Sequence, residues 1–466
     1  ITVESDRPMI SLVAIKGDAI IAVGDASDNL TFSDPGTKVI DCHGMTLIPG
    51  FHDSHCHLLA LASSVINLDC RSQTGSSIDE IKELVKGDTH DKAPGSWVRG
   101  FGYDEALLLE RRHPSRQDLD EAAPFHPVRL EHRSGHALVL NSQAMAFLNI
   151  TKETPDPVSG VIVRDEASRE PTGLFIDMAS HIEYLMQPFR RTEYLRKGVS
   201  LANELLLSKG ITSIQDAGPE NDIQRWRAFQ GLKRDGTLIP RVTMMVGHRH
   251  AAEFLDQGLY PGYGDDVLRI GGVKIMLTLT TGCLHPPLEN LKQIAVGLHG
   301  RGLQLAFHAV EREAIEAAAL VIAEAQRVVS RGNARHRIEH CSEGWPEVVD
   351  LIRASGAMVV TQPSFIYYNG EKYISLVDQE LQPHLYPLAA LSGCGIIWAA
   401  GSDAPVTSPD PLIDIYSAVT RKTQAGQVLS VNNGVTVMDA MKAWTLSAAY
   451  SCFREDVLGT ITAGKL

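Results

Sequence analysis

The chain has 466 residues, of which 44% are hydrophobic and 21% are charged, a balance typical of a globular protein with a large core. Its 43 lysines and arginines against 56 aspartates and glutamates give a formal net charge of -13 without any basic block, which argues against binding to nucleic acid or to anionic membranes. No apolar run approaches the ~20 residues that a membrane-spanning helix needs. Seven scattered cysteines without a Cys-x-x-Cys pair argue against a disulfide framework and fit a reducing cytoplasm.

The two ends of the chain have the pattern of short strands joined by tight turns. Apolar runs at 11–15 and 19–24 flank a Gly17-Asp18 pair, which is typical of a β-hairpin. A second pair of strands is expected around 38–45, and the final residues 458–466 are again strand-like. We therefore expect residues 1–48 and 455–466 to form one small β-sandwich domain beside a main domain at 49–454.

Residues 70–195 have an irregular pattern that interrupts the main domain. They include a helical segment at 78–84, several proline-rich turns and strand-like segments at 97–104 and 127–131. We expect an α+β insertion that packs over one end of the main domain.

Short β-rich apolar runs alternate with amphipathic helical stretches in the remainder of the main domain. Alternation of this kind predicts a parallel sheet, and eight repeats predict a closed (β/α)8 barrel, the TIM-barrel form of the α/β class. The eight runs lie at 49–58, 210–216, 241–246, 273–277, 303–308, 336–340, 358–363 and 396–403.

Histidines and an aspartate stand at the ends of several of these runs, where a barrel places its active site. His55 and His57 are two residues apart in the first run, so they project from the same face of the strand. The fifth, sixth and eighth runs end at His308, His340 and Asp403. A structural histidine or a capping aspartate explains each of them singly, but four histidines and one aspartate at one barrel mouth predict a metal site.

Lys274 lies within the fourth run. A lysine that points into a barrel is costly without a partner, and an ammonium group cannot bind a metal ion. A carbamate formed from this lysine and carbon dioxide would be anionic and could bridge two metal ions. The alternative is an ordinary lysine paired with a nearby carboxylate.

These residues resemble the metal-dependent amidohydrolase superfamily. The resemblance rests on Lys274, His308, His340, Asp403 and the stretch Pro49-Gly50-Phe51-His52-Asp53-Ser54-His55-Cys56-His57. The large insertion and the segments 210–218, 307–310, 337–340 and 401–405 are similar to the YtcJ-like branch, also called amidohydrolase 3, which includes N-substituted formamide deformylases. The resemblance spans nearly the whole chain.

The resemblance implies a binuclear site with two divalent metal ions, for which zinc is expected. It implies that one ion is bound by His55 and His57, the second by His308 and His340, both by a carboxylated Lys274, and one of them by Asp403. The implied reaction is hydrolysis of a non-peptide, amide-type C–N bond by a metal-bound hydroxide, with Asp403 as general base and then general acid.

One departure from the branch pattern leaves an alternative open. The segment after the fifth run reads His308-Ala309-Val310-Glu311-Arg312, and its His-x-x-Glu spacing resembles mononuclear deaminases of the same superfamily. There Glu311 would be the proton shuttle. The favoured interpretation is that Glu311 is a solvated residue that opens the next helix, where the helix dipole favours a carboxylate, because Lys274 and the long insertion both point to the YtcJ-like branch. A binding protein that kept the barrel without catalysis is a third hypothesis.

Substrate contacts are expected from loops and from the insertion. The candidates are Tyr103, Asp104, His136 and Gln362, each of which a structural role explains as well. The chain has no Gly-x-Ser-x-Gly elbow, no phosphate-binding loop and no dinucleotide fingerprint, which excludes serine hydrolases, kinases and dehydrogenases. We expect a small-molecule substrate and a homodimer.

Overall fold

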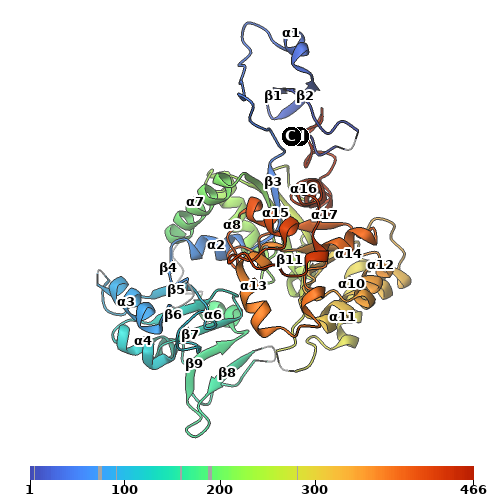
Figure 1. Ribbon diagram of the computed structural model, residues 1–466. Coiled ribbons are helices and arrows are strands. Elements are labelled where there is room, and N and C mark those ends of the chain that lie inside the picture. Colours follow the sequence, from blue (N-terminus) through green and yellow to red (C-terminus); the bar gives the residue numbers. More distant parts are fainter. Residues whose placement is uncertain (5, 72–75, 91, 158–159, 187–191, 281) are drawn as a thin grey trace.

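The structure is a computed structural model that describes residues 1–466 except 5, 72–75, 91, 158–159, 187–191 and 281. It consists of a helix-covered barrel, a second sheet unit inserted after the first barrel strand, and a small terminal unit (Figure 1). The terminal unit and the insertion lie at different ends of the barrel. In the described residues, no helix combines the length and the apolar character that crossing a membrane requires.

The barrel contains the eight predicted strands, all parallel and adjacent in chain order. The first and last strands meet through two backbone hydrogen bonds, from Asp403 N to His55 O at 2.7 Å and from His57 N to Ala404 O at 2.9 Å. The predicted TIM barrel is thereby confirmed. The strands are β3 (Phe51–Cys56), β10 (Ile211–Asp216), β11 (Arg241–Gly247), β12 (Leu268–Met276), β13 (Leu305–Ala309), β14 (Arg337–His340), β15 (Met358–Thr361) and β16 (Trp398–Ala400).

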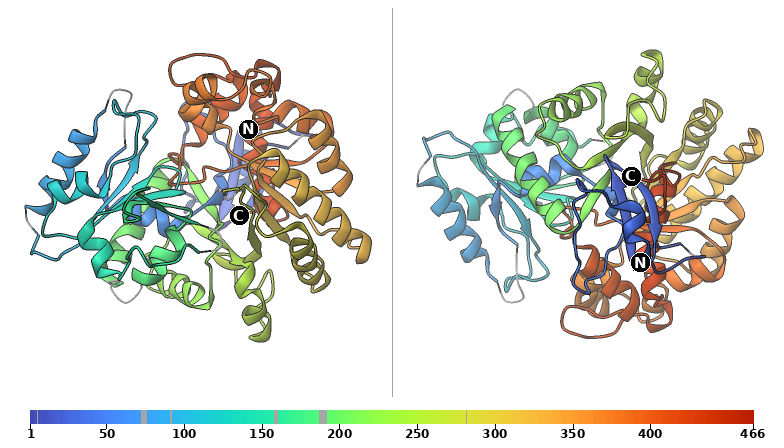
Figure 2. Two further views of the ribbon diagram at one scale, coloured as in Figure 1. Left: turned by 90° about the horizontal axis from the view of Figure 1, so that it is seen from below. Right: turned by 90° about the horizontal axis from the view of Figure 1, so that it is seen from above.

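Helices surround the barrel strands and bury their apolar stripes against them (Figure 2). Helix α11 (Arg312–Val328) shows the cause, because its alanines, valine and isoleucines recur at helical spacing and face the core. The other helices of this layer are α2 (Leu58–Ser64), α7 (Thr192–Ser208), α8 (Ile223–Arg234), α9 (Ala251–Asp256), α10 (Leu288–Gly300), α12 (Pro346–Ser355), α13 (Ser364–Leu376), α14 (Leu388–Gly393), α15 (Pro411–Thr420), α16 (Val437–Ala443) and α17 (Leu446–Ser451).

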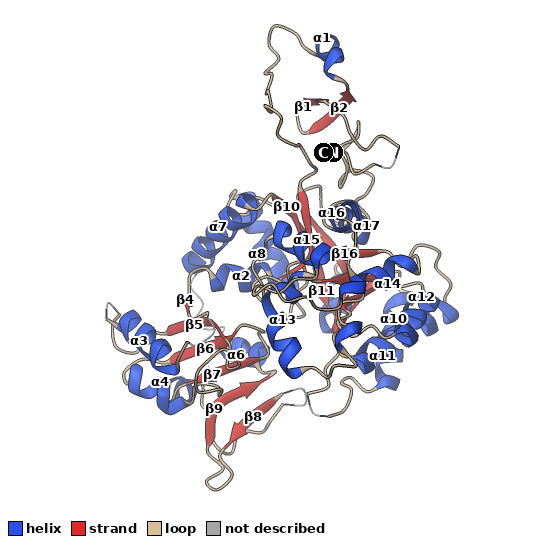
Figure 3. Ribbon diagram, in the orientation of Figure 1, coloured by secondary structure: helices blue, strands red, loops and turns tan. Residues whose placement is uncertain are grey.

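The insertion is a mixed sheet with the strand order β4-β5-β6-β7-β9-β8 (Figure 3). Apolar and polar side chains alternate along β5 and β6, which gives this sheet one apolar face and one polar face. Val98, Val128 and Leu130 pack with the helices α3 and α4, whereas Arg129 and Glu131 point to the opposite side. The elements are β4 (Leu68–Asp69), α3 (Ile78–Thr89), β5 (Val98–Tyr103), α4 (Arg116–Ala122), β6 (Val128–His132), β7 (Ala137–Leu140), α5 (Ser142–Phe147), β8 (Val161–Arg164), β9 (Pro171–Ile176) and α6 (Ala179–Met186).

The two ends of the chain meet in the terminal unit, but its sheet is smaller than expected. It is the two-stranded hairpin of β1 (Leu12–Lys16) and β2 (Ala19–Gly24), followed by the short helix α1 (Asn29–Phe32). Ile20 exchanges backbone hydrogen bonds of 2.7 Å with Lys465 and Gly464.

The prediction of strands at 38–45 and 458–466 was wrong, and the described residues form a hairpin instead of a β-sandwich. A strand needs a continuous series of backbone hydrogen bonds with a neighbouring strand. The hydrogen bonds between Ile20 and residues 464–465 are a single pair and do not continue into such a series. Val39, Ile40 and Met45 consequently leave 64%, 73% and 73% of their surface exposed. The division at 48/49 and 454/455 and the insertion bounds of about 70 and 195 stay predictions.

Candidate metal centre

Six predicted ligand residues come together at the carboxyl end of the barrel. His57 Nε2 lies 3.1 Å from Asp403 Oδ1, and His55 Nε2 lies 3.5 Å from the same oxygen. Lys274 Nζ lies 3.3 Å from His55 Nε2. The ring of His340 lies 4.8 Å from that of His55, and the ring of His308 lies 4.5 Å from that of His340, measured between centroids. Side chains from five different strands thus converge on one place.

The backbone at two of these residues is in the left-handed region. His340 has a φ of 73° and Asp403 a φ of 54°, conformations that non-glycine residues rarely adopt. Simple alternation along β14 would turn His340 away from the side occupied by Glu339, and the left-handed turn at its end changes that direction. His340 Nδ1 is fixed there by the side-chain oxygen of Gln362 at 2.9 Å.

A buried carboxylate holds the Asp403 loop against the first strand. Asp53 Oδ1 accepts from the backbone N–H groups of His55 and Ser402, and its Oδ2 accepts from the Ser402 hydroxyl at 2.5 Å. Burial raises the pKa of Asp53 to about 7, although these hydrogen bonds oppose the rise. Asp53 therefore positions two ligand-bearing strands relative to each other.

His55 has an orienting partner that the sequence analysis did not assign. Glu339 Oε2 lies 2.5 Å from His55 Nδ1, and both glutamate oxygens also accept from Arg337. Arg337 additionally donates to the backbone oxygen of Ser54. Because Arg337 and Glu339 alternate with Ile338 in a short buried strand, the charged pair was a signal that could have been recognised.

Burial keeps the imidazoles of His55, His308 and His340 neutral, as metal ligation requires. It lowers the pKa of His340 to about 4 and those of His55 and His308 well below the usual value. Burial also lowers the pKa of Lys274 to about 8, so that part of this amine is neutral near pH 7. For Asp403 burial opposes ionisation, but the hydrogen bond from His57 and the nearby histidines outweigh it and lower the pKa.

The donor set fits a metal ion. The ligand atoms of His55, His57 and Asp403 all lie within 4.8 Å of one another. The buried atom His340 Nε2 has no hydrogen-bond partner within the described ranges, so it has a lone pair to offer. Imidazole nitrogen and carboxylate oxygen together suit zinc and similar divalent ions.

Three further predicted site residues lie in different places around the cluster. His136, from the turn between β6 and β7, has its ring 5.9 Å from that of His308. Gln362 is fully buried beneath His340. Glu311 is the N-cap residue of α11, as its structural interpretation expected, and its charge helps to raise the pKa of His136. Their predicted roles toward a substrate stay predictions.

Tyr103 and Asp104 belong to a separate cluster between the insertion and α13. The Tyr103 hydroxyl contacts His113 Nδ1 at 2.9 Å. Asp104 lies 3.8 Å from His132 Nε2 and 3.7 Å from Lys372 Nζ. The carboxylates of this cluster face a lysine and Arg133, which marks it as an ion-pair network. The predicted roles of Tyr103 and Asp104 toward a substrate stay predictions.

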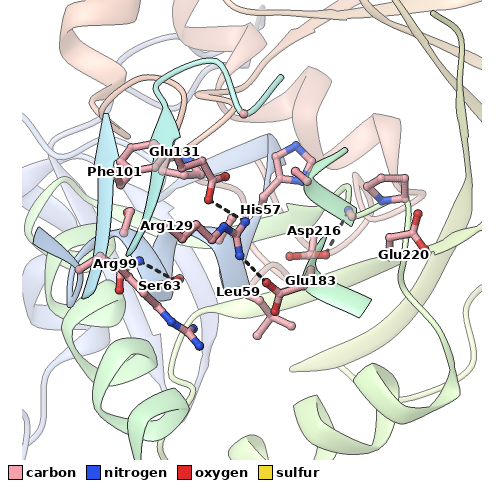
Figure 4. A pocket seen from close by; sticks show the side chains of 18 of the residues that line it. His57, Leu59, Ser63, Arg99, Phe101, Arg129, Glu131, Glu183, Asp216 and Glu220 are labelled. Carbon is pink, nitrogen blue, oxygen red and sulfur yellow. Dashed lines mark hydrogen bonds and ion pairs between the residues drawn. The ribbon is translucent and has the colours of Figure 1, made fainter. Parts of the chain in front are cut away.

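A cavity of about 280 Å³ opens beside His57, between the barrel mouth and the polar face of the insertion sheet (Figure 4). Its insertion wall carries Arg129, whose guanidinium lies 3.0 Å from Glu131 and 2.8 Å from Glu183. Phe101 lines the same wall. The cavity is large enough for a small molecule and combines apolar and charged surface next to the candidate ligands.

The eight-stranded barrel and its ligand cluster define the class of metal-dependent barrel hydrolases. A model of the amidohydrolase family matches residues 38–466, so the chain belongs to that family. It is accordingly a metal-dependent hydrolase that acts on carbon–nitrogen bonds.

Curated relatives and solved structures match over nearly the whole chain. An N-substituted formamide deformylase of Arthrobacter pascens is 28% identical and aligns with 100% of this chain and 90% of its own. A putative amidohydrolase YtcJ of Bacillus subtilis is 26% identical, covering 93% and 85% of the two chains. The crystal structure of an uncharacterized metal-dependent hydrolase of Pyrococcus furiosus is 25% identical, with a TM-score of 0.74 over 98% of this chain and 93% of its own.

Proposed function

We propose that this chain hydrolyses an amide-type, non-peptide C–N bond of a small molecule at a binuclear centre of divalent metal ions, with zinc as the expected metal. The observation that carries the proposal is the environment of Lys274. Its side chain is almost wholly buried among imidazoles, and within the described part of the chain no carboxylate forms an ion pair with it. A carbamate would convert this unmatched cation into an anionic ligand.

The residues of the site would have two roles, metal binding and proton transfer. His55, His57, His308, His340, a carboxylated Lys274 and Asp403 would hold the metal ions. When bound, these ions would supply an ionised water near neutral pH and polarise the substrate carbonyl. Asp403 lies 3.1 Å from His57, and its lowered pKa keeps it ionised, so it can take the proton of the attacking water. It then returns this proton to the leaving nitrogen.

The substrate proposal comes from the relatives and from the cavity. The relative of Arthrobacter pascens bears the name of an enzyme that deformylates N-substituted formamides. The cavity can take the substituent on the nitrogen, because the candidate ligand His57 lines it and Phe101 and Arg129 bound it. We therefore propose N-substituted formamides and other N-acyl amides as the substrate class to test first. A homodimer and a cytoplasmic location are further proposals.

Metal analysis tests the proposal directly. Protein purified without chelator should contain two metal ions per chain, and NMR with ¹³C-labelled bicarbonate should give a carbamate signal that Lys274→Ala removes. Lys292→Ala, which changes a partly exposed lysine paired with Glu289, is the matched control and should retain both ions and the signal. A single ion beside an unmodified lysine would overturn the binuclear centre. Turnover of formamides and N-acyl amides should be measured on the same samples.

A further inference from the structure

A histidine of the insertion reaches the barrel mouth from outside the ligand cluster. His136 lies in the turn between β6 and β7, and its ring is 5.9 Å from that of the candidate ligand His308. Its side chain is 48% exposed, in contrast to the buried rings of His55 and His340. It is therefore the imidazole at this mouth that a substrate can reach most easily.

Asp177 fixes the orientation of this ring. Its Oδ1 lies 2.6 Å from His136 Nδ1, and its backbone N–H donates to the backbone oxygen of His136 at 2.7 Å. The second carboxylate oxygen accepts from the hydroxyl of Thr280. Thr280 follows β12, the barrel strand that carries Lys274. The barrel thus holds Asp177, and Asp177 in turn holds His136.

These contacts determine which nitrogen of His136 is available. A carboxylate only accepts hydrogen bonds, so Nδ1 must carry the hydrogen. Nε2 has no partner in the described part of the molecule, and in the neutral ring it presents a lone pair. The neutral ring is thereby an acceptor of fixed direction beside the ligand cluster.

We propose that Asp177 is a positioning residue that holds His136 Nε2 as an acceptor for the N–H of the substrate, which makes the enzyme selective for secondary over tertiary amides. The inference rests on the proposed amide hydrolysis. An amide carries one acceptor, its carbonyl oxygen, and one donor, its N–H. The metal-ligand cluster would serve the carbonyl, and His136, whose ring lies 5.9 Å from that of His308, offers the N–H an acceptor from the insertion.

Matched substrates and variants test this role. The wild type, His136→Ala and Asp177→Asn would be assayed on an N-alkylformamide and on its N-methylated tertiary analogue, with metal content measured for each protein. Asn keeps the size of Asp177 but permits the opposite tautomer of His136, as loss of an orienting carboxylate does elsewhere. We expect kcat/KM to fall about tenfold or more for the secondary amide and much less for the tertiary one.

Lys372→Met is the control for docking of the insertion, because Lys372 also joins barrel to insertion, 3.7 Å from Asp104. It should leave the ratio of secondary to tertiary turnover unchanged. Equal losses on both substrates in His136→Ala would overturn the inference.

If the wild type hydrolyses neither amide, the proposed function fails, and ¹⁵N NMR of the His136 ring then decides the positioning role. A hydrogen on Nδ1 that Asp177→Asn displaces supports it, and a hydrogen on Nε2 in the wild type contradicts it.

Discussion

Glu339 Oε2 lies 2.5 Å from His55 Nδ1, and this contact connects the candidate metal centre to the barrel interior. Both residues are fully buried, and Arg337 neutralises the glutamate through hydrogen bonds of 2.7 and 2.9 Å. A carboxylate at Nδ1 fixes the hydrogen there and leaves Nε2 of His55 for a metal ion. Such a partner orients the ligand and increases its basicity.

Replacing this carboxylate should weaken metal binding more than it weakens the fold. We expect Glu339→Gln to lower metal affinity about 10- to 100-fold, because the amide can no longer hold His55 in one tautomer. Competition with a metal-sensitive dye would measure the affinity, and circular dichroism would verify the fold. Unchanged metal affinity in a folded variant would show that Glu339 only balances the charge of Arg337.

The two catalytic hypotheses differ in their dependence on Glu311 and Lys274. In the binuclear hydrolase, Lys274→Ala should reduce kcat/KM at least about 100-fold, since each ion would lose one ligand. Glu311→Gln should be mild, because Glu311 begins α11 as its N-cap residue without a side-chain capping hydrogen bond. Steady-state rates on amides and ammonia release from heterocyclic amines would be compared. The reverse pattern would establish the mononuclear deaminase.

The ion pairs of Arg129 should stabilise the insertion. Its side chain is only 10% exposed and contacts both Glu131 and Glu183, so Arg129→Met leaves carboxylates in a largely buried place. We expect a loss of about 2–4 kcal/mol in the free energy of unfolding, measured with urea. Arg353→Met is the matched control, because its pair with Asp350 is exposed, and it should cost less than about 0.5 kcal/mol. Equal effects would contradict this account.

The barrel and the convergence of its candidate ligands could be predicted because both depend on local order in the chain. Alternation of apolar strands with amphipathic helices predicts the barrel, and polar residues that end those strands must then share one mouth. His55, His308 and Asp403 were found in this way. Glu339 was missed because its partner, His55, is 284 positions away in the chain, and only the closed barrel brings them together.

Contacts of the insertion could not be predicted from sequence periodicity. Asp177 meets His136 and Thr280 only after the insertion has docked on the barrel, and no repeating pattern records that docking. The contacts of Tyr103 with His113 and of Asp104 with Lys372 in α13 are likewise not recorded by any repeating pattern. The strand-like composition at 38–45 led to a wrong strand prediction, because strand formation depends on a neighbouring strand as much as on the side chains.

Asp414 should make stability depend on pH. It accepts from the Ser364 N–H at 2.6 Å and from Trp444 Nε1 at 2.7 Å, but burial outweighs these contacts and raises its pKa to about 7. The unfolded chain releases this proton near pH 4, so the folded state holds more protons between about pH 4 and 7. This contribution to stability is complete below pH 4 and decreases as the pH rises through that window, by at most about 1.4 kcal/mol per unit. Asp414→Asn should lack this dependence, so the difference between variant and wild type in urea unfolding should shift in favour of the variant from pH 5 to 7. A constant difference over that range would show that Asp414 is already ionised in the folded protein at pH 5.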